Sequence, residues 1–357
     1  MIKVKIKERY DSLDGLRAFA CAGIVLMHVK ANIAIKPTGS IVINNFIGAT
    51  GDFVFLFMMV SAFALCCGYY EKFNNGNVKT IDFYKKRYTR ILPFFALLTL
   101  IDVIKTIVEE HFHWTDVLQG ELWEAFANVT LMFGLIPCND ITVVGVGWFL
   151  GVIFLFYLLF PFFTSIISTK KSAWIAWGIS LGLYASLRCY FAPVKGSPID
   201  HNAFMLCAPF FLVGGLIYRY RREIVKAIEK QMAKMSLILI ALCYTIWFFL
   251  FPEYRFPLAN LVMYALWLVY AISESSFVRK NTLLNNRLVA FLSDLSMEIY
   301  LCHMMMFRFV EKLHLEHYIK NNDVYYWITS LLVLAGAIIF SYIWKRRIEP
   351  KVINVIE

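Results

Sequence analysis

The sequence predicts an all-α, polytopic membrane protein with about ten transmembrane helices. Of its 357 residues, 60% are hydrophobic and only 17% are charged, whereas charged residues make up about 25% of a soluble domain. Apolar segments long enough to cross a bilayer recur along the whole chain. They lack the strict alternation of apolar and polar residues that membrane strands require, so we expect helices rather than barrel strands.

Each expected helix corresponds to one apolar segment of spanning length. The first follows a basic N-terminal arm and continues through 24–29 without a small-residue cleavage site, so we expect a helix and not a signal peptide. In chain order, the expected helices lie at about 16–35, 46–68, 91–108, 148–167, 172–191, 204–218, 235–251, 257–273, 288–307 and 325–344.

Most of the 35 lysines and arginines fall on one side of this arrangement. Loops rich in Lys and Arg remain in the cytoplasm, so the N and C termini are both predicted to be cytoplasmic. The net charge of +10 is explained by this asymmetry and by anionic lipid headgroups, so no nucleic-acid partner is expected. The basic clusters are the N-terminal arm, 69–90, 169–171, 219–234, 279–287 and the tail after 344.

We expect residues 1–357 to form a single transmembrane domain, with 109–147 as a long external segment. Inside this segment, 122–137 is apolar. A full span there would invert every later helix and move the basic 219–234 cluster outside. Its length of about 16 residues and its Glu124 are also poor for a span, so we expect a re-entrant or interfacial helix.

The eight cysteines do not indicate a disulfide framework, because most lie within the expected helices, where cysteine packs as a small apolar side chain. No cysteine pair has zinc-site spacing with histidines, and His111 and His113 have no evident third ligand. We therefore expect no metal. The sequence also contains no P-loop, no nucleophile elbow and no internal repeat.

The first expected helix carries two ionisable residues, Arg17 and His28, in an otherwise apolar run. Eleven helical steps amount to about three turns plus 20°, so both side chains leave the same face about 16 Å apart. That distance is comparable to the pantetheine arm of coenzyme A, which would place Arg17 on a phosphate and His28 beside the thioester. In the structural alternative, Arg17 anchors the helix end and His28 makes an interhelical hydrogen bond.

The N-terminal stretch YDSLDGLRAFACAGIVLMH resembles the start of acyltransferase 3 family proteins, which carry L-D-G-x-R followed by a histidine. Other stretches resemble the motifs of this family in the same order and span nearly the whole chain. They are GDFVFLFMMVSAFAL (51–65), FYKKRYTRILP (83–93), WFLGVIFLFYLLFP (148–161) and SMEIYLCHMMMF (296–307).

The resemblance has two departures. The acidic residue that many relatives carry after the middle-helix tryptophan is absent, since Trp148 is followed by Phe149 and Leu150, as in a W-F-L branch. The Ser-Gly pair of the second helix is Ser61 and Ala62, a change that we expect to tighten packing.

The resemblance implies a membrane O-acetyltransferase of the bacterial plasma (inner) membrane. Such an enzyme moves an acetyl or short acyl group from cytoplasmic acyl-CoA, with acetyl-CoA as donor substrate, to a hydroxyl of a cell-surface glycan or its lipid-linked precursor. His28 is the expected base or acyl relay. The alternative is a transporter or flippase of glycan intermediates, although inverted repeats with broken midplane helices are not visible. Acceptor identity and oligomeric state stay open.

Donor phosphates are expected to contact Arg17 and a second basic group. Arg87 and Arg90 lie three residues apart and therefore share a helix face, with Lys85 and Lys86 beside them. Positive-inside anchoring is the alternative for this second group.

The remaining candidates are acidic, aromatic or basic residues near the later motifs. Glu298 is either a functional residue, as an orienting partner or an acceptor contact, or a structural residue that makes an interhelical hydrogen bond. His303 is either catalytic or a helix-packing residue. Asp52 either orients a sugar hydroxyl or caps the second helix. Trp148 and Arg188, toward the external face, are candidate acceptor contacts.

Overall fold

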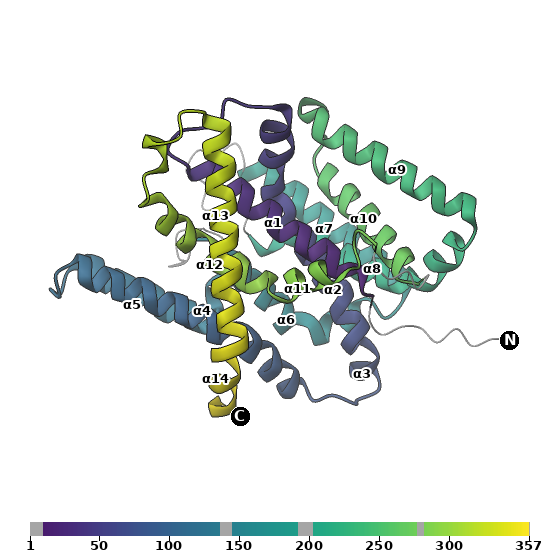
Figure 1. Cartoon of the computed structure of the whole chain (residues 1–357). Coiled ribbons are helices and arrows are strands. Elements are labelled where there is room, and N and C mark those ends of the chain that lie inside the picture. The colour runs from purple at the N-terminus through teal and green to yellow at the C-terminus, as the bar shows by residue number, and fades with distance from the viewer. Residues whose placement is uncertain (1–9, 136–144, 192–202, 277–281, 357) are drawn as a thin grey trace. The chain divides into compact units, whose positions relative to one another are not determined.

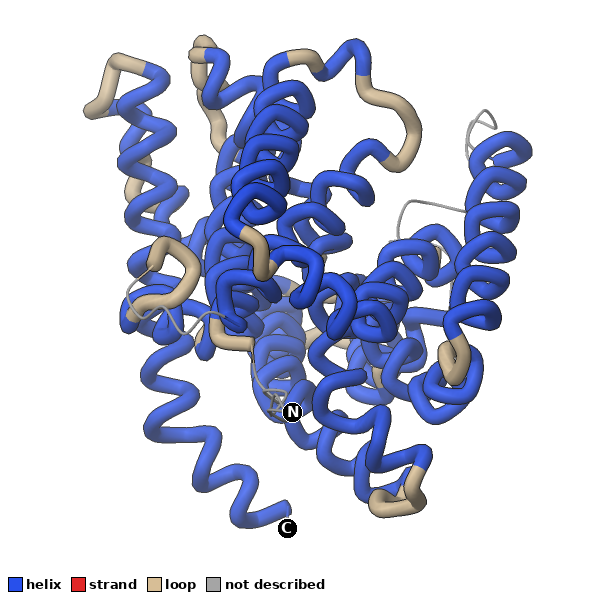
Figure 2. The backbone as a smooth tube through the Cα atoms, turned by 90° about the vertical axis from the view of Figure 1, so that its right-hand side faces the viewer, coloured by secondary structure: helices blue, strands red, loops and turns tan. Residues whose placement is uncertain are grey.

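The computed structural model describes residues 10–135, 145–191, 203–276 and 282–356. The chain is 85% helical, and the described residues contain no strand, as Figure 2 shows. The expected all-α class is therefore confirmed. The basic N-terminal arm before residue 10, and residues 136–144 of the predicted external segment, lie outside the described residues.

The chain divides into two compact units that interleave along the sequence. Unit 1 comprises residues 1–71, 210–297 and 306–336, and unit 2 comprises 72–209, 298–305 and 337–357. Helices α8, α12 and α13 each contribute residues to both units.

The helices of unit 1 are drawn with their labels in Figure 1. They are α1 (Ser12–Asn32), η1 (Val42–Ile47), η2 (Thr50–Asp52), α2 (Phe53–Leu65), η3 (Cys66–Tyr70), α8 (Phe204–Ile228), α9 (Gln231–Leu250), η5 (Pro252–Tyr254), α10 (Ala259–Ser276), α11 (Arg287–Asp294), α12 (Ser296–Glu311), η6 (Leu315–His317) and α13 (Asn322–Ile343).

Unit 2 contains the remaining helices. They are α3 (Glu71–Asn74), α4 (Thr80–Glu109), α5 (Asp116–Thr130), η4 (Met132–Leu135), α6 (Trp148–Ile166), α7 (Lys170–Phe191), η7 (Trp344–Ile348) and α14 (Glu349–Ile356).

Helix α1 is the element around which unit 1 packs, with direct contacts to α2, α10, α11 and η2. Close approach is possible because glycines lie at the contact points. A Cβ on Gly15 would overlap the backbone of Leu284, and one on Gly23 would overlap the ring of Phe53. Ile24 and Val25 on this helix are fully buried. Small residues at such positions let membrane helices approach each other closely, which favours dispersion contacts.

Helices α2 and α8 pack in the same way within unit 1. A Cβ on Gly214 would overlap the carbonyl oxygen of Met59 and the methyl group of Ala62. The rings of Phe55 and Phe210 stack beside this contact, with centroids 4.6 Å apart. Ala62 therefore packs against Gly214 of α8, as the close packing expected at Ser61–Ala62 requires.

Unit 2 is built on α4, which packs against α5 and α6. In Figure 1, α4 and α5 run side by side. The Tyr88 hydroxyl, early in α4, donates to the carbonyl of Val129 at the end of α5 over 2.8 Å, so the two helices are antiparallel. The Tyr84 hydroxyl donates to Leu158 O over 2.6 Å and joins α4 to α6. Aromatic rings also pack between α4 and α6: the ring centroids of Phe83 and Phe160 lie 5.5 Å apart and those of Tyr88 and Phe154 lie 5.8 Å apart.

Each of the ten apolar segments overlaps a helix, and six helices among the described residues are long and apolar enough to cross a membrane. A seventh crossing is added if α11 and α12, which meet at a 68° bend, form one broken span. The count of ten spans and the cytoplasmic termini remain predictions. The six candidates are Ser12–Asn32, Val42–Asn74, Thr80–Glu109, Trp148–Ile166, Gln231–Leu250 and Asn322–Asn354.

The apolar run at 122–137 falls on α5 and η4, and its last two residues are outside the described part of the chain. Helix α5 has 15 residues and ends where Leu131 adopts a left-handed backbone conformation with φ of 58°. A helix of that length is short for a span, so the prediction of a re-entrant or interfacial helix is retained.

The contact between α8 and α2 gives a stability prediction. Gly214→Ala should lower the free energy of unfolding by about 1–3 kcal/mol, because the added methyl group forces the two helices apart. Thermal unfolding in detergent measures the effect. Gly178→Ala is the matched control: no atom lies within 4 Å of its added Cβ, so stability should be unchanged or slightly higher. Equal stability of both variants would contradict the close packing.

Candidate functional site

Arg17 and His28 both lie on α1, as the sequence predicts. The helix runs unbroken from Ser12 to Asn32, so the eleven helical steps from Arg17 to His28 keep the two side chains on one face about 16 Å apart. Both side chains are half-buried, whereas Leu16, Ala18, Val25 and Val29 around them are buried. Arg17 and His28 therefore lie on a partly open face of a helix that is packed on its other faces at these residues.

The imidazole of His28 is oriented by its own helix. Its Nδ1–H donates to the carbonyl oxygen of Ile24 over 2.9 Å. A carbonyl can only accept, so in the neutral ring this bond assigns the proton to Nδ1 and the lone pair to Nε2. The Nε2 atom is then the nitrogen that can take a proton from a hydroxyl or attack an acyl carbon.

The backbone next to His28 is held from two sides. The Tyr326 hydroxyl of α13 donates to the carbonyl of Leu26 over 3.0 Å. On the other side η2 lies against Met27, since a Cβ on Gly51 would come 2.7 Å from the Met27 methyl group. Rigid support of this kind is what a catalytic side chain needs to stay in a productive position.

Asp52 ends η2 and occupies the N-cap position of α2, but its side chain makes no capping hydrogen bond. The capping alternative is therefore wrong. The carboxylate is exposed and accepts a long hydrogen bond of 3.4 Å from the side-chain amide of Asn260, at the start of α10.

Arg255 and Tyr264 complete a polar group around Asp52 that sequence reasoning missed. The Arg255 guanidinium donates from Nε to Phe248 O over 2.7 Å and stacks on the Phe248 ring at 4.1 Å. Its Nη2 atom and the fully buried Tyr264 hydroxyl have no hydrogen-bond partner among the described residues. Burial lowers the pKa of Arg255, and the negative charge of Asp52 opposes that shift.

The only sequence signal for Arg255 was its position between two prolines, in PEYRFP, after an apolar segment. That pattern is also typical of an interfacial loop, so it did not single out Arg255.

The predicted second phosphate site lies on the first turns of α4, in unit 2. Lys85, Lys86 and Arg90 are exposed, whereas Arg87 is half-buried. The Arg87 guanidinium lies 5.7 Å from the ring centroid of Phe83 and 6.0 Å from that of Tyr157. Three exposed cations and one aromatic-anchored arginine therefore form the basic cluster of α4.

Glu298 is fully buried in α12, and its Oε1 lies 3.6 Å from Nζ of Lys345. Neither of its carboxylate oxygens has a hydrogen-bond partner among the described residues. Lys345 and Arg90 are the cations whose charge acts on this carboxylate. The ion pair joins α12 to η7 within unit 2.

His303 is also fully buried, five residues further along α12. Its Nδ1–H donates to the carbonyl oxygen of Tyr300 over 2.6 Å. The Tyr300 hydroxyl in turn donates to Val146 O over 2.7 Å, just before α6. His303 thus belongs to a buried hydrogen-bonded connection between α12 and the start of α6.

Trp148 and Arg188 lie at the start of α6 and near the end of α7. Trp148 is half-buried and meets Phe149 edge to face. Arg188 is exposed, with its guanidinium 5.9 Å from the ring centroid of Tyr184. No described contact brings Trp148 and Arg188 together.

A family model described as an acyltransferase domain matches residues 10–344 of the chain, which includes every candidate residue above except Lys345. No curated protein and no solved structure matches the chain.

The buried pair of Glu298 and Lys345 gives a second prediction. Lys345→Met should lower the free energy of unfolding by about 3–5 kcal/mol, because it leaves a carboxylate buried without its cation. Combining it with Glu298→Gln should recover part of that loss, as measured by thermal unfolding. Arg347→Met, an exposed neighbour, is the control and should have little effect. If Lys345→Met were no more destabilising than the control, the ion pair would not contribute to unit 2.

Proposed function

The chain belongs to the acyltransferase 3 family of membrane acyltransferases, and from this premise we propose that it acylates a sugar hydroxyl. The donor is cytoplasmic acyl-CoA, acetyl-CoA in the simplest case. The acceptor is a cell-surface glycan or its lipid-linked precursor, and the enzyme works in a bacterial plasma membrane as a member of the W-F-L branch. The observation that carries the proposal is the oriented His28 imidazole, about 16 Å along one helix face from Arg17.

His28 acts as the base in this proposal. The acceptor hydroxyl loses its proton to Nε2 as its oxygen bonds to the thioester carbonyl carbon. The carbon–sulfur bond then breaks, and the imidazolium returns the proton to the departing coenzyme A thiolate. In the relay variant, Nε2 first takes the acyl group itself and then passes it to the hydroxyl. Both routes need the Nδ1-protonated tautomer, which the bond to Ile24 supports.

Arg17 binds donor phosphate through paired, charge-assisted hydrogen bonds. The separation of about 16 Å between Arg17 and His28 suits an extended pantetheine arm. Arg87, Arg90, Lys85 and Lys86 are proposed as a second phosphate contact, since three of the four are exposed and cationic.

Asp52, Asn260, Arg255 and Tyr264 are proposed to bind the acceptor. Sugar hydroxyls both donate and accept hydrogen bonds, so they can donate to the Asp52 carboxylate and accept from the Arg255 guanidinium. A buried donor such as Arg255 Nη2 gains most from such a partner, because leaving it without one costs about 1–3 kcal/mol. Trp148 and Arg188 remain proposed acceptor contacts on the strength of the sequence alone.

Glu298 and His303 are proposed to position helix α12 for the reaction. Both are fully buried, and each bonds or pairs with protein groups in unit 2. They therefore support the reaction by fixing the α12 backbone, and a direct proton-transfer role would require a path to substrate.

The first test is the substitution His28→Ala. It should abolish acyl transfer, because no other group in the proposal takes the hydroxyl proton, while acyl-CoA affinity should change by less than about twofold, since the base does not contact the phosphates. Acceptor acylation is measured by mass spectrometry, and acyl-CoA affinity by calorimetry on purified protein. The control is Asn32→Ala, one turn further along α1. Normal acylation by the His28 variant at wild-type abundance would favour the transporter alternative.

The second test separates donor from acceptor residues. Arg17→Ala, Arg87→Ala and Arg90→Ala should each weaken acyl-CoA binding by about 1.5–3 kcal/mol, and the wild-type affinity should fall as salt rises. Arg255→Gln should instead raise KM for the acceptor and leave acyl-CoA affinity unchanged. Steady-state kinetics with each substrate varied in turn gives both values. Donor binding that is insensitive to all three arginines would place the phosphate site elsewhere.

A further inference from the structure

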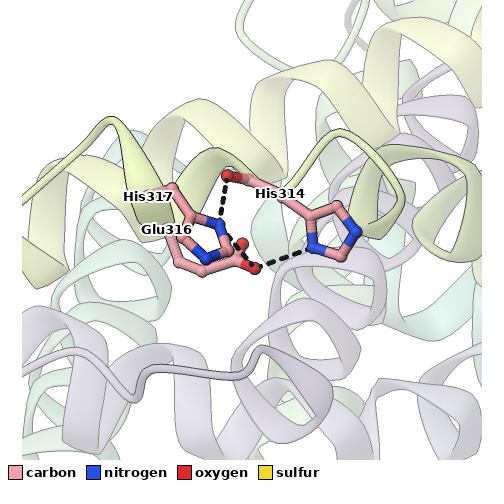
Figure 3. A group of neighbouring side chains, drawn as sticks. All are labelled: His314, Glu316 and His317. Carbon is pink, nitrogen blue, oxygen red and sulfur yellow. Dashed lines mark hydrogen bonds and ion pairs between the residues drawn. The ribbon is translucent and has the colours of Figure 1, made fainter.

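Two histidines and a glutamate converge on the short connection between α12 and α13. His314, Glu316 and His317 lie within four residues of sequence around η6, and Figure 3 shows their side chains gathered on one side of the turn. His314 adopts a left-handed backbone conformation with φ of 48° and ψ of 45°, which is uncommon for a residue other than glycine. This conformation turns the chain so that the His314 ring lies beside the two side chains that follow.

The distances within this cluster match those of a metal site. One potential ligand atom from each residue lies within 4.8 Å of the other two. Glu316 Oε1 lies 3.1 Å from His314 Nδ1 and 3.6 Å from His317 Nδ1. The His317 Nδ1 atom also lies 3.3 Å from the carbonyl oxygen of His314, so a metal ion bound to this nitrogen replaces that hydrogen bond. Two ligands of a tetrahedral zinc ion, at bond lengths of about 2.0–2.1 Å, are about 3.3 Å apart. The observed separations lie on either side of that value.

The carboxylate at the centre of the cluster is held in place by a second residue. The Tyr325 hydroxyl of α13 donates to Glu316 Oε2 over 3.3 Å, which leaves Oε1 directed at the imidazoles. Glu316 is 21% exposed, whereas the two imidazoles are 67% and 70% exposed. The cluster therefore combines a carboxylate held by Tyr325 with two imidazoles that water and ions can reach.

We propose that His314, Glu316 and His317 bind one divalent transition-metal ion, with Zn²⁺ as the expected occupant. Two imidazole nitrogens and one carboxylate oxygen are a common ligand set for zinc, and water would complete the tetrahedron. Tyr325 serves as the outer-shell partner that orients the carboxylate. This site is independent of the acyl-transfer residues, and it differs from the expectation of no metal, which considered only the cysteines and the pair His111 and His113.

Calorimetric titration of ZnCl₂ into the purified full-length protein, without a histidine tag and in detergent, tests the site. The wild type should bind one equivalent, and His314→Ala combined with His317→Ala should abolish that binding. Tyr325→Phe should weaken it by about 10–100-fold, as expected for loss of a group that orients a metal ligand.

The matched control is His111→Ala with His113→Ala, a second pair of exposed histidines in a helix connection. It should bind Zn²⁺ as the wild type does. Thermal unfolding without metal checks that each variant is folded. If a variant is not folded, Glu316→Gln, which keeps the side-chain shape, is tested in its place. The proposal is overturned if the wild type shows no binding up to about 1 mM Zn²⁺. It is equally overturned if the His314/His317 variant binds like the wild type, or if only the control variant loses binding.

Discussion

The close approach of the start of α1 to the segment before α11 is the constraint on which unit 1 depends. Gly15 leaves no room for a Cβ against the Leu284 backbone, and the Asp14 carboxylate accepts a hydrogen bond of 3.0 Å from the Ser293 hydroxyl. The Ser12 amide donates to the Ser275 hydroxyl over 2.9 Å, which satisfies one of the free N–H groups of the first turn. These contacts therefore fix the orientation of α1 within unit 1. They also fix the direction of the helix face that carries Arg17 and His28.

That fixed direction gives a physical reason for the L-D-G-x-R pattern. Asp14 accepts a hydrogen bond from Ser293 and Gly15 permits close packing, so both have a structural role in this pattern. Further along α1, the Tyr326 hydroxyl donates to the carbonyl of Leu26, and η2 lies against the side chain of Met27. The His28 imidazole is hydrogen-bonded to its own helix, and contacts near both ends hold that helix. The side chain therefore loses little conformational entropy when a substrate binds.

The sequence was sufficient for the features that depend on helical periodicity and on motifs. The all-α class, the helix that carries Arg17 and His28, and the family were predicted from local residue patterns. Features that depend on side chains from distant segments could not be predicted in this way. The pairing of Glu298 with Lys345 joins residues 47 positions apart, and the group around Asp52 gathers Arg255 and Tyr264 from more than 200 positions away. Nothing in a lone arginine within PEYRFP distinguishes a buried guanidinium from an interfacial one.

The group around Glu298 and the group around Asp52 differ in how their charged and polar atoms are compensated. Burying a charge is costly unless a partner compensates it. At Glu298 the compensating cation, Lys345, belongs to the protein and lies 3.6 Å away, so the charge is balanced by the protein itself, although neither carboxylate oxygen has a hydrogen-bond partner among the described residues. At Arg255 and Tyr264 the buried donor atoms have no protein acceptor among the described residues, although Asp52 supplies a negative charge nearby. A group that is electrostatically balanced but short of hydrogen-bond acceptors is suited to a neutral, hydroxyl-rich ligand, which adds acceptors without adding charge. By this reasoning, a sugar fits this group better than a phosphate does.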